Sequence, residues 1–329
     1  MAWIKFLREK WFYALLLAVA LLLPLLISNR YHFQIVIMGC LFSIAALSMN
    51  LILGYTGQAS LAHAGFFGIG AYGVALLTKE GMSVWLALPL SSLLSALVGL
   101  LIGLPTLRTR GSYFAIGTLC FNIIVTQIVD RWEGLTEGAR GLMGIPGPAP
   151  LPLPGGYEIA FKTLAAHYYL VLAFLLLTLL AIRQIMKSLV GRSFRAIRGN
   201  EELAEALGIH PMREKLLSFT VSCFLAGVGG VLYATYIGFL SPELTDYHVS
   251  FDALIYIMIG GVGTLAGPII GTLLIVTLPE ALQIAAEYRL LFYGLILIVM
   301  IIYLPRGIVG WVRERGSRRG SEEGEWKRS

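Results

Sequence analysis

The sequence has few charged residues, since only 13% of its 329 residues are Asp, Glu, Lys or Arg. Soluble domains carry about 25%. Hydrophobic residues instead make up 57% of the chain, and the mean hydropathy is +0.78. This balance excludes an ordinary soluble protein and is typical of a polytopic membrane protein.

Cysteine is also scarce. Cys40, Cys120 and Cys223 each lie within an apolar run, and none of them belongs to a CxxC pair. The pattern gives no support for disulfides or for zinc, so we expect these side chains to pack in the core and the chain to have no metal site.

Several catalytic and nucleotide-binding motifs are missing as well. There is no GxxxxGK[ST] phosphate loop, no HExxH and no GxSxG. The chain is therefore not expected to be an enzyme, and energy for any transport must come from a partner or an ion gradient. An ion-driven transporter needs carboxylates within the membrane, and the only close candidate is Asp252, at the edge of an apolar run. A helix cap or an interface residue is the alternative role for this side chain.

Nine apolar runs approach or exceed the roughly 20 residues that a spanning helix needs. They cover residues 11–27, 35–53, 61–77, 84–104, 113–129, 168–185, 216–237, 251–278 and 290–304. We expect an all-α polytopic bundle with a transmembrane domain over residues 1–312, whose first run is a retained helix rather than a signal peptide. The charged tail at 313–329 is expected to be disordered.

The net charge of +6 would suggest nucleic acid in a soluble protein, but here the basic residues lie beside apolar runs. Such residues mark the cytoplasmic side. Lys5, Arg8 and Lys10 place the amino terminus inside, and alternation then places the segment 191–213 inside and 130–166 outside. One crossing per run would leave the basic tail outside, which contradicts the same rule.

The run 251–278 resolves this conflict, because it is too long for one untilted span and is interrupted by helix-breaking residues. We expect two short passes here, an even number of crossings and two cytoplasmic termini. The predicted break consists of Gly260, Gly261, Gly263, Gly267 and Pro268.

A second break is predicted at residues 54–58, followed by many small residues. Small residues allow close helix packing, whereas interrupted helices can also face a solute near the membrane midplane. Polar residues in or beside apolar runs are the candidates for a translocation path, and hydrogen bonding between helices is the alternative for each. These residues are Asn50, Thr56, Gln58, Ser60, His63 and Asn122.

The external segment 130–166 has proline at every second position from Pro146 to Pro154. This spacing enforces an extended, polyproline-like backbone. The segment is either a passive loop or a docking site for an extracytoplasmic partner.

The segment 191–213 predicts a short amphipathic helix between two spans. Asn200 can cap its first turn, and Gly208 tolerates a left-handed stop. Leu203, Ala206 and Leu207 fall on one face of this helix. The segment is either an ordinary connecting loop or a helix that a partner binds.

The string Glu205-Ala206-Leu207-Gly208, preceded by Arg192, Arg195 and Arg198, resembles the EAA loop of ABC importer permeases. Most of the chain resembles the branched-chain amino acid permease family of these importers. The resemblance is to the LivM-like permease subunit rather than to its LivH-like partner. The strings that carry this resemblance are LSMNL at 47–51, GYTGQ at 54–58, FFGIGAY at 66–72, RTRGSYFAI at 108–116, GLMGIP at 141–146, GRSFRAIR at 191–198 and IGGVGTLAGP at 259–268. The residues before the external Gly-Leu depart from the family pattern, being Thr136 to Arg140.

The resemblance implies a type II-like importer fold with broken or re-entrant helices, in the cytoplasmic membrane of a prokaryote. It implies a second, LivH-like permease subunit, two ATPase subunits that bind ATP and Mg, and an extracytoplasmic solute-binding protein. The implied solutes are leucine, isoleucine and valine, with urea, short amides or other small organic solutes as the alternative.

The resemblance also implies that residues 200–208 form a lever moved by the ATPases. Leu203, Ala206 and Leu207 would fill a groove on the ATPase, while the acidic residues select register and partner. The implied coupling residues are Arg198, Asn200, Glu201, Glu202, Leu203, Glu205, Ala206, Leu207 and Gly208.

Overall fold

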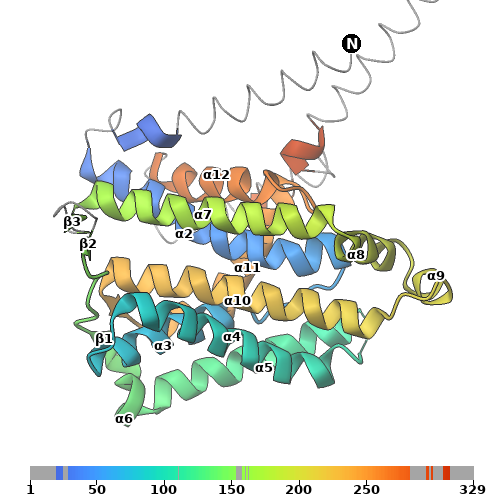
Figure 1. Cartoon of the computed structure of the whole chain (residues 1–329), viewed down its shortest axis with the longest axis horizontal. Coiled ribbons are helices and arrows are strands. Elements are labelled where there is room, and N and C mark those ends of the chain that lie inside the picture. The colour runs from blue at the N-terminus through green and yellow to red at the C-terminus, as the bar shows by residue number, and fades with distance from the viewer. Residues whose placement is uncertain are drawn as a thin grey trace, which may run out of the picture.

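A bundle of helices lying along one another forms the body of the molecule (Figure 1). The computed structural model describes residues 20–24, 29–109, 111–152, 158–159, 161, 163–281, 294–295, 298 and 307–311. Most of the first and last predicted apolar runs, and the whole tail at 313–329, lie outside the described residues.

The elements follow one another in this order. The first half contains α2 (Arg30–Asn50), the π-helical turn η1 (Leu51–Tyr55), α3 (His63–Lys79), α4 (Val84–Thr106), α5 (Ser112–Arg131), α6 (Glu133–Thr136), the 3-10 turn η2 (Gly138–Arg140), β1 (Leu142–Met143), β2 (Leu151–Pro152) and β3 (Glu158–Ile159). The second half contains α7 (Leu164–Lys187), α8 (Leu189–Gly199), α9 (Glu201–Ala206), α10 (Pro211–Ile237), β4 (Phe239–Leu240), the 3-10 turn η3 (Pro242–Thr245), α11 (Tyr247–Gly260) and α12 (Gly267–Ala281).

Among the described residues, five helical segments are long and apolar enough to cross a membrane. They are Arg30–Tyr55, Val84–Thr106, Ser112–Arg131, Leu164–Lys187 and Pro211–Ile237. Exposed leucines follow the outer side of α4, which suits a helix surrounded by lipid or by another apolar surface. The all-helical polytopic fold expected from the sequence is confirmed.

Three predicted runs form shorter helices. The run 61–77 becomes α3, with 17 residues. The run 251–278 is split, as expected, into α11 with 14 residues and α12 with 15. None of the three reaches the about 20 residues of an untilted span.

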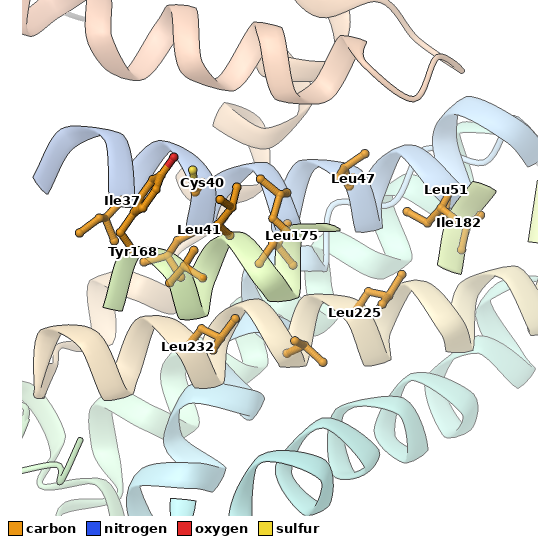
Figure 2. Close-up of a cluster of buried hydrophobic side chains, with 14 of the residues drawn as sticks. Ile37, Cys40, Leu41, Leu47, Leu51, Tyr168, Leu175, Ile182, Leu225 and Leu232 are labelled. Atoms are coloured by element: carbon orange, nitrogen blue, oxygen red, sulfur yellow. The ribbon is translucent and has the colours of Figure 1, made fainter. Parts of the chain in front are cut away.

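The core is built around α10, which packs against α2, α3 and α4. Figure 2 shows one part of it, where Leu41 of α2, Leu175 of α7 and Leu225 of α10 meet. Cys40 and Cys223 are buried, as expected, but Cys120 is exposed. The expectation of core packing was wrong for Cys120 because it lies on the outward side of α5, where an apolar side chain meets the surroundings of the bundle.

Glycines allow α10 and α3 to cross closely. A Cβ atom on Gly230 would overlap the carbonyl oxygen of Phe67, and one on Gly70 would overlap the backbone of Gly227. Backbone atoms cannot yield as the end of a flexible side chain can, so this crossing requires glycine.

We expect Gly230→Ala to destabilise the folded protein by about 3 kcal/mol, because the added methyl forces α10 and α3 apart. The measurement is the thermal midpoint of the detergent-purified chain. Gly134→Ala is the matched control, since a Cβ at Gly134 meets nothing within 4 Å. Equal midpoints for the two variants would contradict this account of the crossing.

The bundle has two distinct ends (Figure 1). α8 and α9 lie at one end, whereas α6 and the strands β1, β2 and β3 lie at the other. There β1 pairs with β4, and β2 pairs with β3, in antiparallel fashion. The described part of the segment 130–166, which is predicted to be external, thus lies opposite the segment 191–213 predicted to be cytoplasmic.

Candidate coupling and translocation site

The short helix α9 is delimited by the residues that the sequence singles out. The Asn200 side chain accepts a hydrogen bond from the backbone N–H of Leu203, at 3.0 Å. Glu201 and Glu202 occupy the first turn, where the helix dipole favours acidic residues. Gly208 has a φ of +87°, and Pro211 begins α10.

An apolar pair on α9 points away from the rest of the chain. Leu203 is 60% exposed and Leu207 is 74% exposed. Glu205 and Ala206 are exposed beside them, while Ala204 is buried and holds the helix against the bundle. Leu203 within α9 and Leu207 directly after its last residue form a small hydrophobic surface that a partner can cover.

An ion pair that the sequence did not reveal fixes α9 to α10. Lys215 Nζ lies 2.6 Å from an Oε atom of Glu201, and the Lys215 side chain is only 3% exposed. A buried ammonium needs such a partner. Glu201 is therefore engaged within the chain, and Glu205 is better placed to meet a partner.

Arg198, in the last turn of α8, connects this end of the bundle to both helix breaks. Its Nη1 donates a hydrogen bond to the carbonyl oxygen of Gly54, at the first break. A Cβ atom on Gly57 would lie 3.3 Å from Cγ of Arg198, and one on Gly263 would overlap the guanidinium group. One side chain thus touches the two interrupted segments.

Asn50 joins the two breaks to each other. Its Nδ2 donates to the carbonyl oxygen of Thr264, at 2.8 Å, and its Oδ1 accepts from the N–H of Gly263, at 2.9 Å. The Thr264 side chain in turn bonds the backbone of Gly261 and Gly267. Side chains therefore satisfy backbone groups that the interruption leaves without helical partners.

The interruption at residues 261–266 coincides with the predicted glycines and proline. α11 ends at Gly260, and Gly261 and Gly263 have positive φ values of 125° and 75°. α12 begins at Gly267, directly followed by Pro268. The backbone conformation at this break is one that glycine adopts without strain.

A second polar cluster lies where α3 begins. The N–H groups of Leu61, Ala64 and Gly65 donate to side chains of other helices. The acceptors are Thr118 Oγ1 at 3.1 Å, Ser250 Oγ at 2.9 Å and Asn122 Oδ1 at 2.6 Å. The start of α3 is thus capped by residues distant in sequence.

Asn122 also reaches the segment before α11, since its Nδ2 donates to the carbonyl oxygen of Thr245 at 3.0 Å. His63 Nε2 lies 2.8 Å from Ser222 Oγ of α10. The sequence predicted a functional role for Asn122 and His63 of this cluster. It did not single out Ser250, Thr118 or Ser222.

Most of the predicted path residues are buried and engaged within the chain. The relative exposure of Asn50, Thr56, Ser60, His63 and Asn122 is at most 2%, and only Gln58 is partly exposed. Thr56 donates to the carbonyl oxygen of Ile52, and Ser60 Oγ accepts from the N–H of Ala62. In this conformation the five residues make hydrogen bonds within the bundle. This was the alternative to a role in the translocation path.

No group of three or more His, Cys, Asp or Glu residues that could hold a metal ion occurs in the described part of the chain. The polar groups gather instead in two clusters, one where Arg198 and Asn50 contact both helix interruptions and one at the start of α3. Such interruptions are typical of transporters.

The family model described as the permease component of the branched-chain amino acid transport system matches residues 31–303. The chain belongs to this family. The related proteins in this family are transport permeases and not enzymes. This chain is therefore a membrane permease subunit.

Two named proteins show how far the similarity extends. The high-affinity branched-chain amino acid transport system permease protein LivM of Salmonella typhimurium is 33% identical over 324 residues, covering 93% of this chain and 76% of the relative. LivH of Escherichia coli, from the system of the same name, is 26% identical over 296 residues, covering 84% of this chain and 94% of the relative. LivM and LivH relatives together indicate a multi-subunit system with paired permeases. No solved structure matches this family permease.

Proposed function

We propose that this chain is the LivM-like permease subunit of an ABC importer that moves leucine, isoleucine and valine across the cytoplasmic membrane of a prokaryote. A LivH-like permease, two ATPases that bind ATP and Mg, and an extracytoplasmic solute-binding protein complete the importer. The proposal is supported by family membership and by the exposed leucines of α9 at one end of the bundle.

In this proposal, α9 docks on an ATPase through Leu203, Ala206 and Leu207. Closure of the ATPase pair around ATP moves α9, and α8 moves with it. Arg198 then displaces the backbone at Gly54 and Gly263, because its side chain contacts both breaks. Coupling requires contacts that differ between the two states, and the Arg198 contacts are the ones that can change.

The buried polar residues keep the breaks rigid in this mechanism. Asn50 and Asn122 each bond two segments that are distant in sequence. Rigid breaks transmit a push from Arg198 to the neighbouring helices instead of absorbing it. We therefore propose Asn50, Thr56, Ser60, His63 and Asn122 as supports of the path, and Gln58 as the member of this set that can meet the solute.

The proposed orientation places the α9 end in the cytoplasm and the strands at the external end. The basic residues Lys5, Arg8 and Lys10, and the basic tail after Trp311, favour cytoplasmic locations for both termini. Residues 1–312 would form the transmembrane domain, with lipid against the exposed leucines of α4.

Reconstitution tests the proposed function. Proteoliposomes holding this chain, its partner permease, the ATPases and the binding protein are expected to take up labelled leucine only with ATP and all components present. Omission of the ATPases is the control. Uptake by this chain alone under an ion gradient would overturn the ABC proposal, whereas ATP-dependent uptake of urea and not of leucine would overturn only the substrate.

A further inference from the structure

One carboxylate within the bundle has no role in the contacts described so far. Asp252 lies in the second turn of α11 and is half-buried, while Tyr247, His248 and Phe251 nearby are exposed. Among the described residues, Asp252 forms no hydrogen bond and no ion pair. His248, one turn earlier on α11, interacts electrostatically with this carboxylate, and the exposed residues around Asp252 place it beside the outward side of the helix.

Hydrogen bonds fix the depth of this residue in the membrane. Ser250 Oγ accepts from the N–H of Ala64, next to Gly65, which bonds Asn122. Asn122 lies halfway along α5, a 20-residue helix long enough to span the membrane. Since Asp252 follows Ser250 by two residues, or about 3 Å along the helix axis, it lies near the middle of the bilayer.

Lipid is an unfavourable neighbour for this group. Acidic side chains at the centre of the bilayer are among the costliest to expose to hydrocarbon, and they normally face water, a polar partner or a transport path. The edge of α11 that holds Asp252 is thus expected to face an aqueous space or another charged group.

We infer that Asp252 lines the solute path and that its carboxylate binds the ammonium group of an α-amino acid passing through the middle of the membrane. The inference rests on the proposed import function and adds the residue that contacts the solute. Phe251, the exposed residue directly before Asp252 in α11, offers apolar surface near it to a branched side chain. The start of α3, at the same depth, cannot bind the solute carboxylate through its first N–H groups, because Thr118, Ser250 and Asn122 already occupy them.

The first test is leucine uptake by the reconstituted importer containing Asp252→Asn. Uptake is expected to fall about tenfold or more, as for the loss of a charged hydrogen bond. ATP hydrolysis stimulated by the loaded binding protein is expected to persist, because α9 and Arg198 are unchanged. Asp252→Glu should retain part of the uptake. Glu80→Gln removes an exposed carboxylate from the turn between α3 and α4 and is expected to leave uptake unchanged.

The second test locates the side chain without relying on transport. Asp252→Cys, in a Cys120→Ser background, is treated with the water-soluble cationic reagent methanethiosulfonate ethylammonium in the assembled complex. Labelling is expected, since a residue on the path is accessible from water. Protection in every nucleotide state would overturn the inference.

The remaining outcomes separate the inference from the proposed function. Unchanged leucine uptake by Asp252→Asn would overturn the inference alone. Loss of the partner permease from the purified Asp252→Asn complex would show that the carboxylate pairs with a basic group of that subunit, and would also overturn it. Absence of ATP-dependent leucine uptake by the wild-type importer would overturn the proposed function, whereas the labelling result would still decide whether residue 252 lines an aqueous path.

Discussion

Replacing Leu203 and Leu207 together by Asp is expected to abolish ATP-dependent leucine uptake by the reconstituted importer. Both side chains are exposed in the isolated chain and would become buried when an ATPase covers α9. Burying two unpaired carboxylates in an apolar groove is strongly unfavourable. The measurements are leucine uptake and the amount of ATPase that copurifies with the permease, and both are expected to fall to background.

The double change should leave α9 folded, because the Asn200 cap and the buried Ala204 remain. Glu205→Ala is the comparison on the same helix, since Glu205 is exposed and its charge is expected to select the partner rather than to supply the apolar contact. It is expected to retain most of the uptake. Full uptake with both leucines replaced would show that α9 is an ordinary connecting loop.

The second large effect is expected for Arg198→Ala, with uptake reduced about tenfold or more, because a hydrogen bond from a charged group such as that of the Arg198 guanidinium to Gly54 is worth about 1.5 kcal/mol or more. The ATPases should stay bound and hydrolyse ATP, since the leucines of α9 are intact. Movement of α8 would then no longer reach Gly54 and Gly263. The ratio of leucine transported to ATP hydrolysed measures this loss of coupling.

Arg192→Ala removes the same charge from the same helix and serves as the control. Arg192 is exposed, and no hydrogen bond or ion pair joins it to a described residue. We expect nearly normal coupling in this variant. An Arg198→Ala importer with the wild-type ratio of transport to hydrolysis would exclude Arg198 as the connection between α8 and the breaks.

Features set by neighbouring residues could be predicted from the sequence. The cap at Asn200, the positive φ of Gly208 and the interruption between Gly260 and Gly267 follow from rules that act within one turn of helix. The apolar runs predicted the long helices for the same reason. These rules also identified α9, the element proposed to contact the ATPases.

Contacts between distant segments could not be predicted in this way. The pairing of Lys215 with Glu201 depends on how α9 folds back on α10. Polar residues within apolar runs look alike whether they face a solute or cap another helix. Asn122 and His63 were therefore assigned to the path, although the structure shows them buried and hydrogen-bonded within the bundle.

The capping of α3 by other helices has a consequence for biogenesis. The N–H of Ala64 is bonded by Ser250, a residue 186 positions later in the chain. A nascent chain that ends before Ser250 lacks this acceptor, so the start of α3 cannot reach its final arrangement when it enters the membrane. The central part of this permease therefore matures late in synthesis, only after α11 has been made and inserted.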